Sequence, residues 1–450
     1  MSIELKRSMG ITAATSMVVG IIVGVSIFVQ PAEVTRLVPS SPGIILAWLV
    51  SGVLTLCAAL VCAELSRLFP QTGGVYVFLR KIYSPALAFL WGWGMFVSMH
   101  AGILAAIAVV LARYAGYFFG LRDSGIRMLA MAAILLVSFV QYLGVKPGSA
   151  LQVTLTAAKL CAIALICALI FILGGTSHQA LPVYAEQPVH LASFGLAVAA
   201  GLFSFGGWHM VSYSAGETKN PERTIPRALV YGVLIVTACY TLLNAAYLYV
   251  MPLPSVATST RVAADAMERV LGPAGGKAIT VVIIISALGA LNGIALAGPR
   301  VYYAMAQDGL AFRWMSALHP KRQTPYLAIA AQAVWACILA ATNSYRALFT
   351  RVIYTEWLFF ALLAAGIFVL HRRGQYTPKF LAFGYPLLPI VSCVTSAAIA
   401  ANQIWAAPRE SFWGLSLLLM GLPVYFFWAH RPTTKRAARG TSTDAHDRLS

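Results

Sequence analysis

The feature that most constrains this chain is a series of apolar runs, each close to 20 residues long, that recurs along nearly its whole length. A run of that length is what an α-helix needs to cross about 30 Å of hydrocarbon. Because hydrocarbon offers no partner to free backbone groups, repeated runs of this kind predict an all-α integral membrane protein. We place about twelve spans, at roughly 12 to 38, 42 to 68, 86 to 117, 127 to 143, 150 to 174, 190 to 213, 228 to 251, 278 to 306, 326 to 343, 349 to 370, 379 to 402 and 411 to 430.

The amino-acid composition also favours a membrane protein. Of the 450 residues, 60% are apolar and 10% are charged, and the mean hydropathy is +0.79, whereas a soluble domain usually carries about a quarter charged residues. Pro31 and further spans follow the first run, in place of a small-residue cleavage site, so we expect no signal peptide. No long linker separates the spans. We expect one transmembrane domain over residues 1–450, embedded in lipid from about 12 to 430.

The charges are distributed unequally between the two sides of the membrane. A net charge of +18 would suggest nucleic-acid binding in a soluble protein. Here, with the N-terminus inside, about twice as many Lys and Arg residues flank the inner span ends as the outer ones, which predicts that both termini are cytoplasmic. We interpret residues 431–450 as a basic cytoplasmic tail near anionic lipid headgroups, without a nucleic-acid partner. A bacterial inner membrane fits the short termini.

Motifs for chemistry are missing from the sequence. It contains no P-loop, HExxH, paired CxxC or GxSxG, which argues against an ATP-driven pump or an intramembrane hydrolase. We therefore expect no enzyme activity, no cofactor and no metal. The cysteines all fall inside spans without metal-ligand spacing, as Cys57, Cys62, Cys161, Cys167, Cys239, Cys337 and Cys393.

The first and the sixth spans are interrupted at mid-depth by small residues, at Gly20 to Phe28 and at Gly201 to Trp208. A lone GxxxG, such as Gly20 with Gly24, is typical of close helix packing. Interruptions in two spans that lie five apart instead favour an inverted repeat of five plus five spans, with a substrate site at the breaks. An unwound turn leaves free amides and carbonyls, and in a membrane these are tolerated only where they line a cavity or bind a ligand.

Several linked motifs then carry a family resemblance. Gly24-Val25-Ser26-Ile27-Phe28 stands where a GSGIF-like stretch is usual, and Phe203 with Gly206-Gly207-Trp208 is similar to an FxxGGW form. The run from Gly216 to Pro226 matches GExxNPxRxxP, and Glu64 to Tyr76 matches ELxxxxPxxGGxY. The chain thereby resembles the amino acid-polyamine-organocation superfamily, and within it the L-type amino acid transporter-like branch, which includes bacterial neutral amino acid exchangers.

The resemblance implies a leucine-transporter-type fold with helices 1 and 6 interrupted. It places the substrate carboxylate at the break in span 1, the substrate amine at backbone carbonyls, and an aromatic lid at Phe203. The substrate-binding residues that it implies are Ile21, Ile22, Gly24, Val25, Ser26, Ile27, Phe203, Ser204, Gly206 and His209.

Two of these residues depart from the family pattern. Ser26 stands where glycine is usual, and its hydroxyl either adds a substrate contact or stiffens the turn. His209 replaces a frequent Asn. It is a side-chain selector or proton-responsive group in one interpretation, and in the commoner one a core histidine hydrogen-bonded to the backbone.

Lys159 is a cation inside a span, where insertion costs roughly 3 kcal/mol. Its neighbours in the sequence supply no carboxylate, so its partner must come from another span. In the branch that this chain resembles, a span 5 lysine occupies the place of sodium and links span 1 to a hydroxyl of span 8. The resemblance thus implies an ion-site surrogate made of Lys159, Gly20 and Ser286, and no sodium site. The alternative is a lysine that extends to the interface with only structural value.

The remaining ionisable residues are harder to interpret. Glu64, Glu217 and Asp308 lie near inner span ends, where pairing with Arg67, Arg223 or Arg300 competes with plain solvated positions. Glu356 lies near the outer start of span 10, and we expect an outer-rim carboxylate rather than a proton carrier. His100 is expected to be a satisfied packing residue.

We therefore expect a secondary transporter that exchanges small or medium neutral L-amino acids by alternating access, independently of sodium. Proton-coupled uptake of an amino acid or amine on the same fold is the first alternative. A sensor that binds amino acids without moving them is the second. In the animal members of the branch, a cysteine between spans 3 and 4 links a heavy chain; residues 118–127 contain none, so we expect no disulfide-linked partner.

Overall fold

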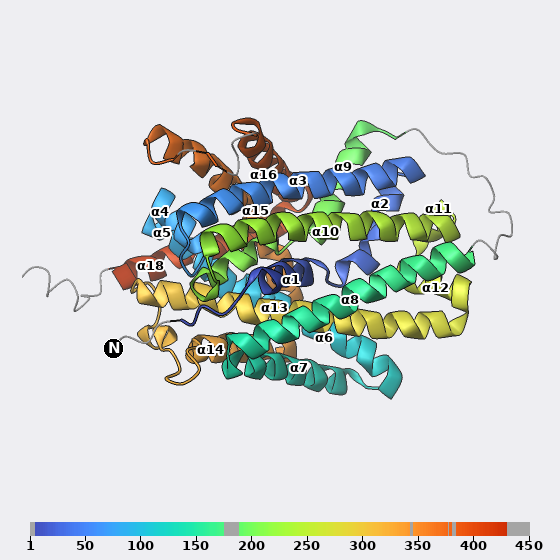
Figure 1. Ribbon diagram of the computed structural model, residues 1–450, viewed down its shortest axis with the longest axis horizontal. Coiled ribbons are helices and arrows are strands. Elements are labelled where there is room, and N and C mark those ends of the chain that lie inside the picture. The colour runs from blue at the N-terminus through green and yellow to red at the C-terminus, as the bar shows by residue number, and fades with distance from the viewer. Residues whose placement is uncertain (1–4, 175–188, 343–344, 377, 380–383, 430–450) are drawn as a thin grey trace, which may run out of the picture.

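The computed structural model describes residues 5–174, 189–342, 345–376, 378–379 and 384–429, and within these ranges the chain is helical, with no strand. The predicted basic tail, 431–450, lies outside the described residues. In the part of the chain that the structure describes, ten helices are long and apolar enough to cross a membrane, and two shorter apolar helices bring the number to the twelve expected spans (Figure 1). The predicted all-helical membrane fold is thereby confirmed.

The spans follow one another in chain order. They are Ile11–Ile22 (α1) with Gln30–Leu37 (α2), Ser41–Leu68 (α3), Pro85–Gly94 (α5) with His100–Phe119 (α6), Asp123–Leu143 (α7), Val145–Leu173 (α8), Leu191–Ser204 (α9) with Trp208–Glu217 (η4), Pro221–Val250 (α10), Pro273–Gln307 (α13), Tyr326–Thr342 (α14), Tyr345–Arg372 (α15), Leu387–Ala406 (α16), and Pro408–Leu419 (α17) with Gly421–Ala429 (α18). The shorter elements are Ser26–Phe28 (η1), Val75–Ile82 (α4), the π-helical turn Met95–Met99 (η2), Leu253–Thr258 (α11), Val262–Leu271 (α12) and Arg313–Ser316 (η5).

Several boundaries differ from those predicted from hydropathy. The helices α10 and α13 begin seven and five residues early, at Pro221 and Pro273, because proline is favoured in the first helical turn even where the sequence is still polar. Span 11 begins late, at Leu387, directly after Pro386. The connection between spans 7 and 8 forms the two short helices α11 and α12.

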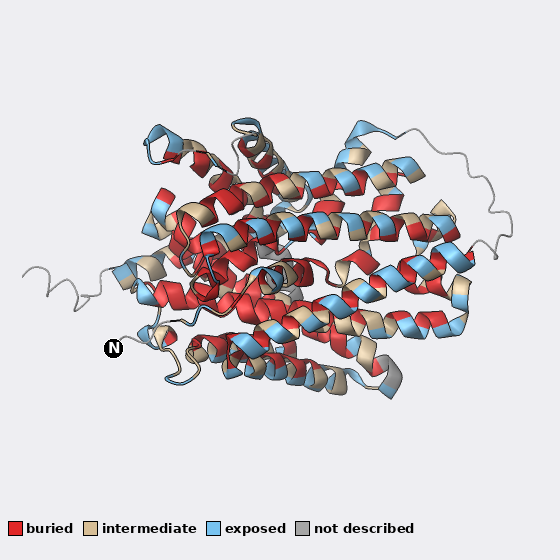
Figure 2. Cartoon of the chain, in the orientation of Figure 1, coloured by how far each residue is buried: buried red, intermediate tan, exposed pale blue. Residues whose placement is uncertain are grey.

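Burial follows the lipid-facing pattern expected of a helix bundle. The helices α6 and α13 are buried for most of their length, and α16, α17 and α18 lie at the periphery. The outer faces of the peripheral helices are exposed and apolar, for example at Leu46, Leu136 and Ile172 (Figure 2). A chain with so much exposed apolar surface along twelve spans is an integral membrane protein.

The two interrupted spans cross in opposite directions. The second half of span 1, α2, packs on the first half of span 6, α9, and α1 packs on η4. The chain begins at the end of the bundle that also holds α4, α14 and α18, at the left of Figure 1; α11, α12 and α2 lie toward the other end. This antiparallel pairing of corresponding halves is the arrangement that an inverted repeat produces.

Ion pairs close the end of the bundle where the chain begins. Arg300 of α13 binds both carboxylate oxygens of Glu217 at 2.8 Å, and both side chains are fully buried. The amides of Ser8 and Met9 donate to the Glu217 carbonyl at 2.8 and 2.9 Å. The N-terminal segment, span 6 and span 8 are thereby joined at one point.

Two further pairs lie near this end. Arg67 binds Glu64 at 2.7 Å, and Arg80 of α4 binds Asp308, which also accepts from the Tyr76 hydroxyl at 2.9 Å. The predicted acids are therefore paired rather than simply solvated. Their partners include Arg67 and Arg300, and Arg80 in place of Arg223.

The buried Glu217–Arg300 pair predicts a large effect on stability. Removing one partner leaves an uncompensated buried charge, which costs about 3 to 5 kcal/mol. We expect Arg300→Met to lower the melting temperature of the purified protein sharply, and Glu217→Gln combined with Arg300→Met to recover part of the loss. Arg36→Met, which breaks the exposed Arg36–Glu33 pair, is the control and should change little. An Arg300→Met protein as stable as the control would contradict the assignment.

Candidate functional site

Span 1 breaks directly after α1. Val23 leaves the helical region, with φ −72° and ψ 78°, and the chain resumes a helical turn at Ser26. The amides of Val25, Ser26 and Ile27 begin this turn, so they lack preceding helical carbonyls. Free amides at the start of a helical segment favour an anion such as a carboxylate.

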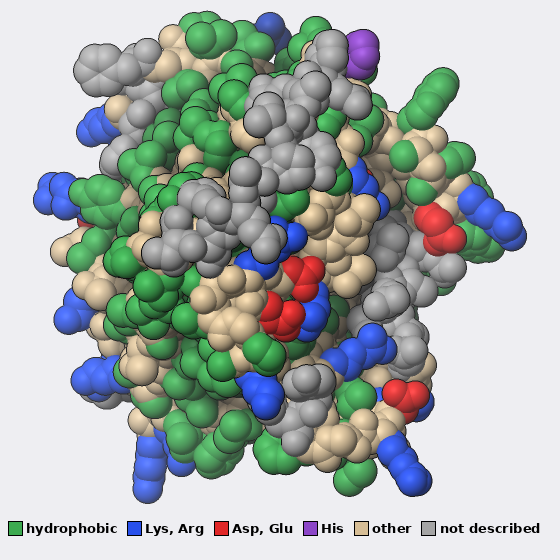
Figure 3. Space-filling view, turned by 90° about the vertical axis from the view of Figure 1, so that its right-hand side faces the viewer, with side chains coloured by type: hydrophobic (Ala, Val, Ile, Leu, Met, Phe, Trp, Pro, Cys, Tyr) green, Lys and Arg blue, Asp and Glu red, His purple; other side chains and the backbone are tan. Residues whose placement is uncertain are grey.

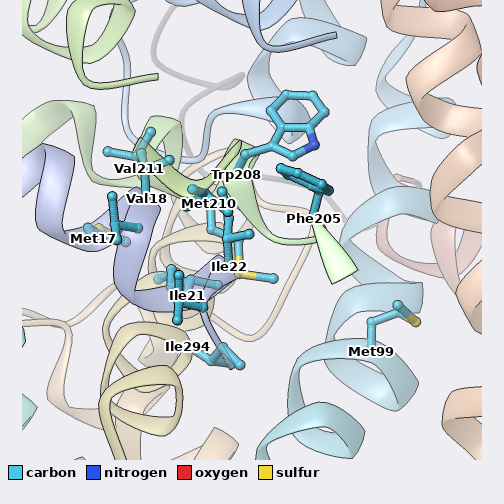
Figure 4. Packing of buried hydrophobic residues seen from close by; sticks show 14 of the residues in the cluster. Met17, Val18, Ile21, Ile22, Met99, Phe205, Trp208, Met210, Val211 and Ile294 are labelled. Carbon is cyan, nitrogen blue, oxygen red and sulfur yellow. The ribbon is translucent and has the colours of Figure 1, made fainter. Parts of the chain in front are cut away.

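Span 6 breaks between α9 and η4. Gly207 has φ +96°, a conformation that residues with a side chain rarely adopt. A Cβ atom at this position would lie 2.5 Å from Ile21 Cγ2, so the absence of a side chain also lets span 6 approach span 1. Figure 4 shows Ile22 of α1 next to Met210 of η4, with Phe205 and Trp208 on the adjoining side.

The buried ammonium of Lys159 joins the first break to two other spans. Its Nζ atom donates to the carbonyls of Gly20, Val23 and Ser286 at 3.0, 2.7 and 3.0 Å. An ammonium has three donors, and each is used here. The structure thus brings together the three residues of the predicted ion-site surrogate, and Lys159 is fully buried rather than extended to an interface.

Ser286 contacts Lys159 differently from what the resemblance implied. Its backbone carbonyl, rather than its hydroxyl, accepts from the ammonium. The hydroxyl instead lies 3.0 Å from the Val23 carbonyl and 3.2 Å from the Gly24 carbonyl. Since a Cβ atom at Gly289 would lie 2.9 Å from Lys159 Nζ, glycine at that position makes room for the ammonium.

Tyr240 of α10 joins the two breaks, and the sequence interpretation missed it. Its hydroxyl lies 2.9 Å from the Ile22 carbonyl and 3.2 Å from the Ser204 carbonyl. The ring packs against Trp48 and Phe205 and is fully buried. The sequence does contain a signal for this residue. Tyr240 and Asn244 lie one helical turn apart, so they form a polar face on the otherwise apolar span 7.

The predicted substrate-binding residues lie around the breaks with different exposure. Val25 and Ser26 are half-buried, whereas Ile21, Ile22, Gly24 and Ile27 are buried. In span 6, Phe203 is 45% exposed, and Gly206 is also exposed. The Ser204 hydroxyl is buried and has no partner among the described residues. The Ile22 carbonyl is already bonded by Tyr240, which leaves Ile21 as the freer acceptor of the two.

Two cavities open toward the end of the bundle opposite the ion pairs. One, of about 430 Å³, lies between α2, α9, α15 and α16 and is lined by Phe203, Tyr354 and Trp357. The other, of about 380 Å³, lies beside α12 and includes Arg113 and Lys277. Figure 3, which faces this end, shows acidic and basic side chains together near the middle of the surface.

Two sequence expectations about buried ionisable groups were wrong. Neither ring nitrogen of His209 has a hydrogen-bond partner among the described residues, so it is not a core histidine bonded to the backbone. Glu356 is buried rather than at an outer rim, because α15 begins at Tyr345 and places it three turns inside the helix. His100 is partly satisfied: Nδ1 lies 3.0 Å from the Tyr302 hydroxyl, and Nε2 has no partner in the described part of the chain.

The fold and the site define a class of protein: a twelve-span membrane transporter in which two broken helices meet. A family model described as amino acid permease matches residues 9–427. The chain belongs to the amino acid permease family, and the family resemblance drawn from its motifs is confirmed.

Relatives agree over nearly the full length. The chain is 32% identical to the serine/threonine exchanger SteT of Bacillus subtilis, over 94% of this chain and 97% of the relative. It is 30% identical to the human b(0,+)-type amino acid transporter 1, over 95% of this chain and 89% of the relative. It is 28% identical to the human large neutral amino acids transporter small subunit 2, over 96% of this chain and 82% of the relative. The family and these relatives are transporters rather than enzymes.

Replacing Lys159 should reduce transport more than it reduces the stability of the folded protein. Lys159→Ala leaves three carbonyls without their donor, at about 1 to 3 kcal/mol for each buried group, but it leaves no unpaired charge. We expect amino acid counterflow in proteoliposomes to fall about tenfold or more, with a smaller change in melting temperature. Lys146→Ala, an exposed lysine on the same helix, is the control. Unchanged uptake by Lys159→Ala would refute the role.

Substitution of Gly207 should also reduce transport. Alanine at φ +96° costs about 1 to 2 kcal/mol in backbone strain, and its Cβ atom would displace Ile21. We expect Gly207→Ala to reduce counterflow at least about tenfold. Gly195→Ala in the same span, where a Cβ atom meets nothing within 4 Å, should retain wild-type counterflow. Equal activity of the two variants would show that the break does not need glycine.

Proposed function

We propose that this transporter exchanges small or medium neutral L-amino acids by alternating access, without sodium. The observation that carries the proposal is the Lys159 ammonium bonded to the Gly20, Val23 and Ser286 carbonyls. A cation held at these oxygens gives the broken helix its positive partner permanently. Coupling to a sodium ion at the same oxygens would require that ion to compete with a covalently attached charge.

The substrate backbone fits the free groups of the two breaks. The amides of Val25, Ser26 and Ile27 suit the carboxylate. The carbonyl of Ile21 suits the ammonium best, since the Ile22 and Ser204 carbonyls both already accept from Tyr240. Gly24 and Gly206 keep side chains away from the substrate, and Phe203, half-exposed above the break, is placed to cover it.

Small polar or apolar side chains suit this site best. Ser26 and Ser204 provide hydroxyls close to the breaks. The relative SteT is named a serine/threonine exchanger and another relative a large neutral amino acids transporter, which supports neutral substrates. We take L-serine and L-threonine as the first candidates.

We infer an outward-facing arrangement with both termini in the cytoplasm of a bacterium, in its inner membrane. The end where the chain begins is closed by the buried Glu217–Arg300 pair, and both cavities open at the other end. Lys and Arg residues are about twice as numerous at the span ends on the side where the chain begins, which supports a cytoplasmic placement of that side.

We further propose that residues 1–450 act as a single transporter domain without a disulfide-linked heavy chain. The stretch between spans 3 and 4 has no cysteine. The seven cysteines, all within helices, are free thiols.

Counterflow in proteoliposomes tests the function. Vesicles loaded with unlabelled L-serine should accumulate external radiolabelled L-serine, equally well in sodium and in choline chloride. Excess L-threonine or L-alanine should compete, whereas L-glutamate and L-arginine should compete weakly. Empty vesicles and vesicles with Lys159→Ala protein are the controls. Dependence on sodium, or accumulation without internal amino acid, would contradict exchange as proposed.

A further inference from the structure

A second group of buried polar atoms lies beside the breaks and takes no part in the proposed amino acid site. It contains Glu356 on α15 and His209 on η4. Glu356 Oε1 and both ring nitrogens of His209 lack hydrogen-bond partners among the described residues. Buried polar atoms without partners are rare and destabilising, so their presence calls for a ligand or a functional state.

Aromatic rings connect the two residues. Phe360, one turn after Glu356 on the same face of α15, packs against His209 with ring centroids 4.9 Å apart. Tyr213 lies 5.6 Å from His209 by the same measure. Trp91 and Trp208 complete the ring cluster around His209, at 5.8 and 5.5 Å.

Glu356 has no positive partner in this cluster. Among the described residues no cation forms an ion pair with it. The elements packed against α15 carry as ionisable groups Cys57, Cys62, Glu64, Arg67, Tyr76, Arg80, Lys81, His100, Arg113, Tyr114, Tyr326, Cys337, Cys393, Arg409 and Glu410. The η4 segment carries His209, Tyr213 and Glu217, the last of which is paired with Arg300. Among its described side chains α15 itself carries Tyr354 and, exposed at its end, His371 and Arg372.

The cations of that set are engaged or distant. Arg67 and Arg80 bind Glu64 and Asp308, and Lys81, Arg113 and Arg409 are exposed. The rings packed on His209 are those of Tyr213, Phe360, Trp91 and Trp208, which carry no positive charge. An ionised carboxylate buried among neutral groups is strongly disfavoured, so the packed cluster requires that its charge be cancelled.

We propose that the buried Glu356 carboxyl group, one helical turn from the Phe360 ring that packs on His209, is a proton-binding site that must be occupied for the transporter to adopt the packed state seen here. The carboxylate takes one proton from water and becomes a neutral carboxylic acid. It returns that proton to water when η4 moves away from α15. The closely packed rings suit a proton, which needs no space of its own.

The proton has a route to the carboxylate. Glu356 as a residue is 9% exposed, although its Oε1 atom is buried. Its neighbours Tyr354 and Trp357 line the cavity that contains Phe203. Proton exchange with the external solution is therefore possible beneath the substrate lid.

Linkage then makes transport depend on pH. If alternating access passes through the packed state, exchange is fast at low pH and slows as pH rises and the protonated fraction of Glu356 falls. His209 is a neighbour of the site, and its substitution should move the midpoint of this dependence. The transport readout rests on the proposed exchange, whereas the occupancy of the site can be measured without transport.

Infrared spectroscopy of the purified protein measures occupancy directly. The wild type should show a protonated carboxylic acid band that titrates with pH and is missing in Glu356→Gln. Glu222→Gln, at an exposed carboxylate, should keep the band. A band that is missing in the wild type, or that persists in Glu356→Gln, would overturn the proposal.

Counterflow measured from pH 5 to pH 9 tests whether transport depends on protonation of Glu356. Wild-type and Glu222→Gln exchange should fall about tenfold or more across this range. Glu356→Gln, which mimics the neutral acid, should retain exchange with a flat profile. If that variant does not fold, Glu356→Asp should shift the midpoint. A flat wild-type profile, or an unshifted profile in the Glu356 variant, would overturn the pH linkage, whereas loss of counterflow at every pH in the wild type would refute the proposed exchange instead.

Discussion

The interaction on which the rest of this structure depends is the contact between one buried ammonium and three backbone carbonyls. Helix 1 is broken in the middle of an apolar bundle, where freed carbonyls have no water to bind. Lys159 supplies donors to Gly20 in the last turn of α1, to Val23 at the break and to Ser286 on span 8. The charge and the broken helix stabilise one another, because the carbonyls satisfy the buried ammonium and the ammonium satisfies the carbonyls.

The proposed substrate site also depends on the close approach of neighbouring spans at two glycines. Gly289 leaves space for the ammonium, and Gly207 lets span 6 reach Ile21 of span 1. Tyr240 then bonds a carbonyl at each break. The two broken helices are thus joined by hydrogen bonds from one side-chain hydroxyl to their main-chain carbonyls, and among the described residues no such bond engages the amides that follow the first break. The buried Glu217–Arg300 pair lies at the end of the bundle where the chain begins, and the cavity lined by Phe203 lies toward the other end, as the proposed outward-facing arrangement requires.

Much of this arrangement is predictable from the sequence, and the limits have physical causes. Hydropathy finds the spans because lipid acts on each run locally, and glycines mark the breaks because they weaken helices locally. Lys159 is conspicuous because a charge in an apolar run is costly wherever it lies. The contacts of Tyr240 and the partner of Asp308 depend on residues far apart in the chain, so no local pattern reveals them. Glu356 was misplaced because hydropathy fixed the start of α15 only within a turn and gave no information on which face the carboxylate occupies.

An experimental structure of the protein in lipid with L-serine bound tests the central claim most directly. The account predicts the serine carboxylate within hydrogen-bonding distance of the Val25, Ser26 or Ile27 amides, with Lys159 Nζ still bonded to the Gly20 and Val23 carbonyls. Serine density elsewhere, or a helix 1 that is continuous and free of Lys159, would contradict it.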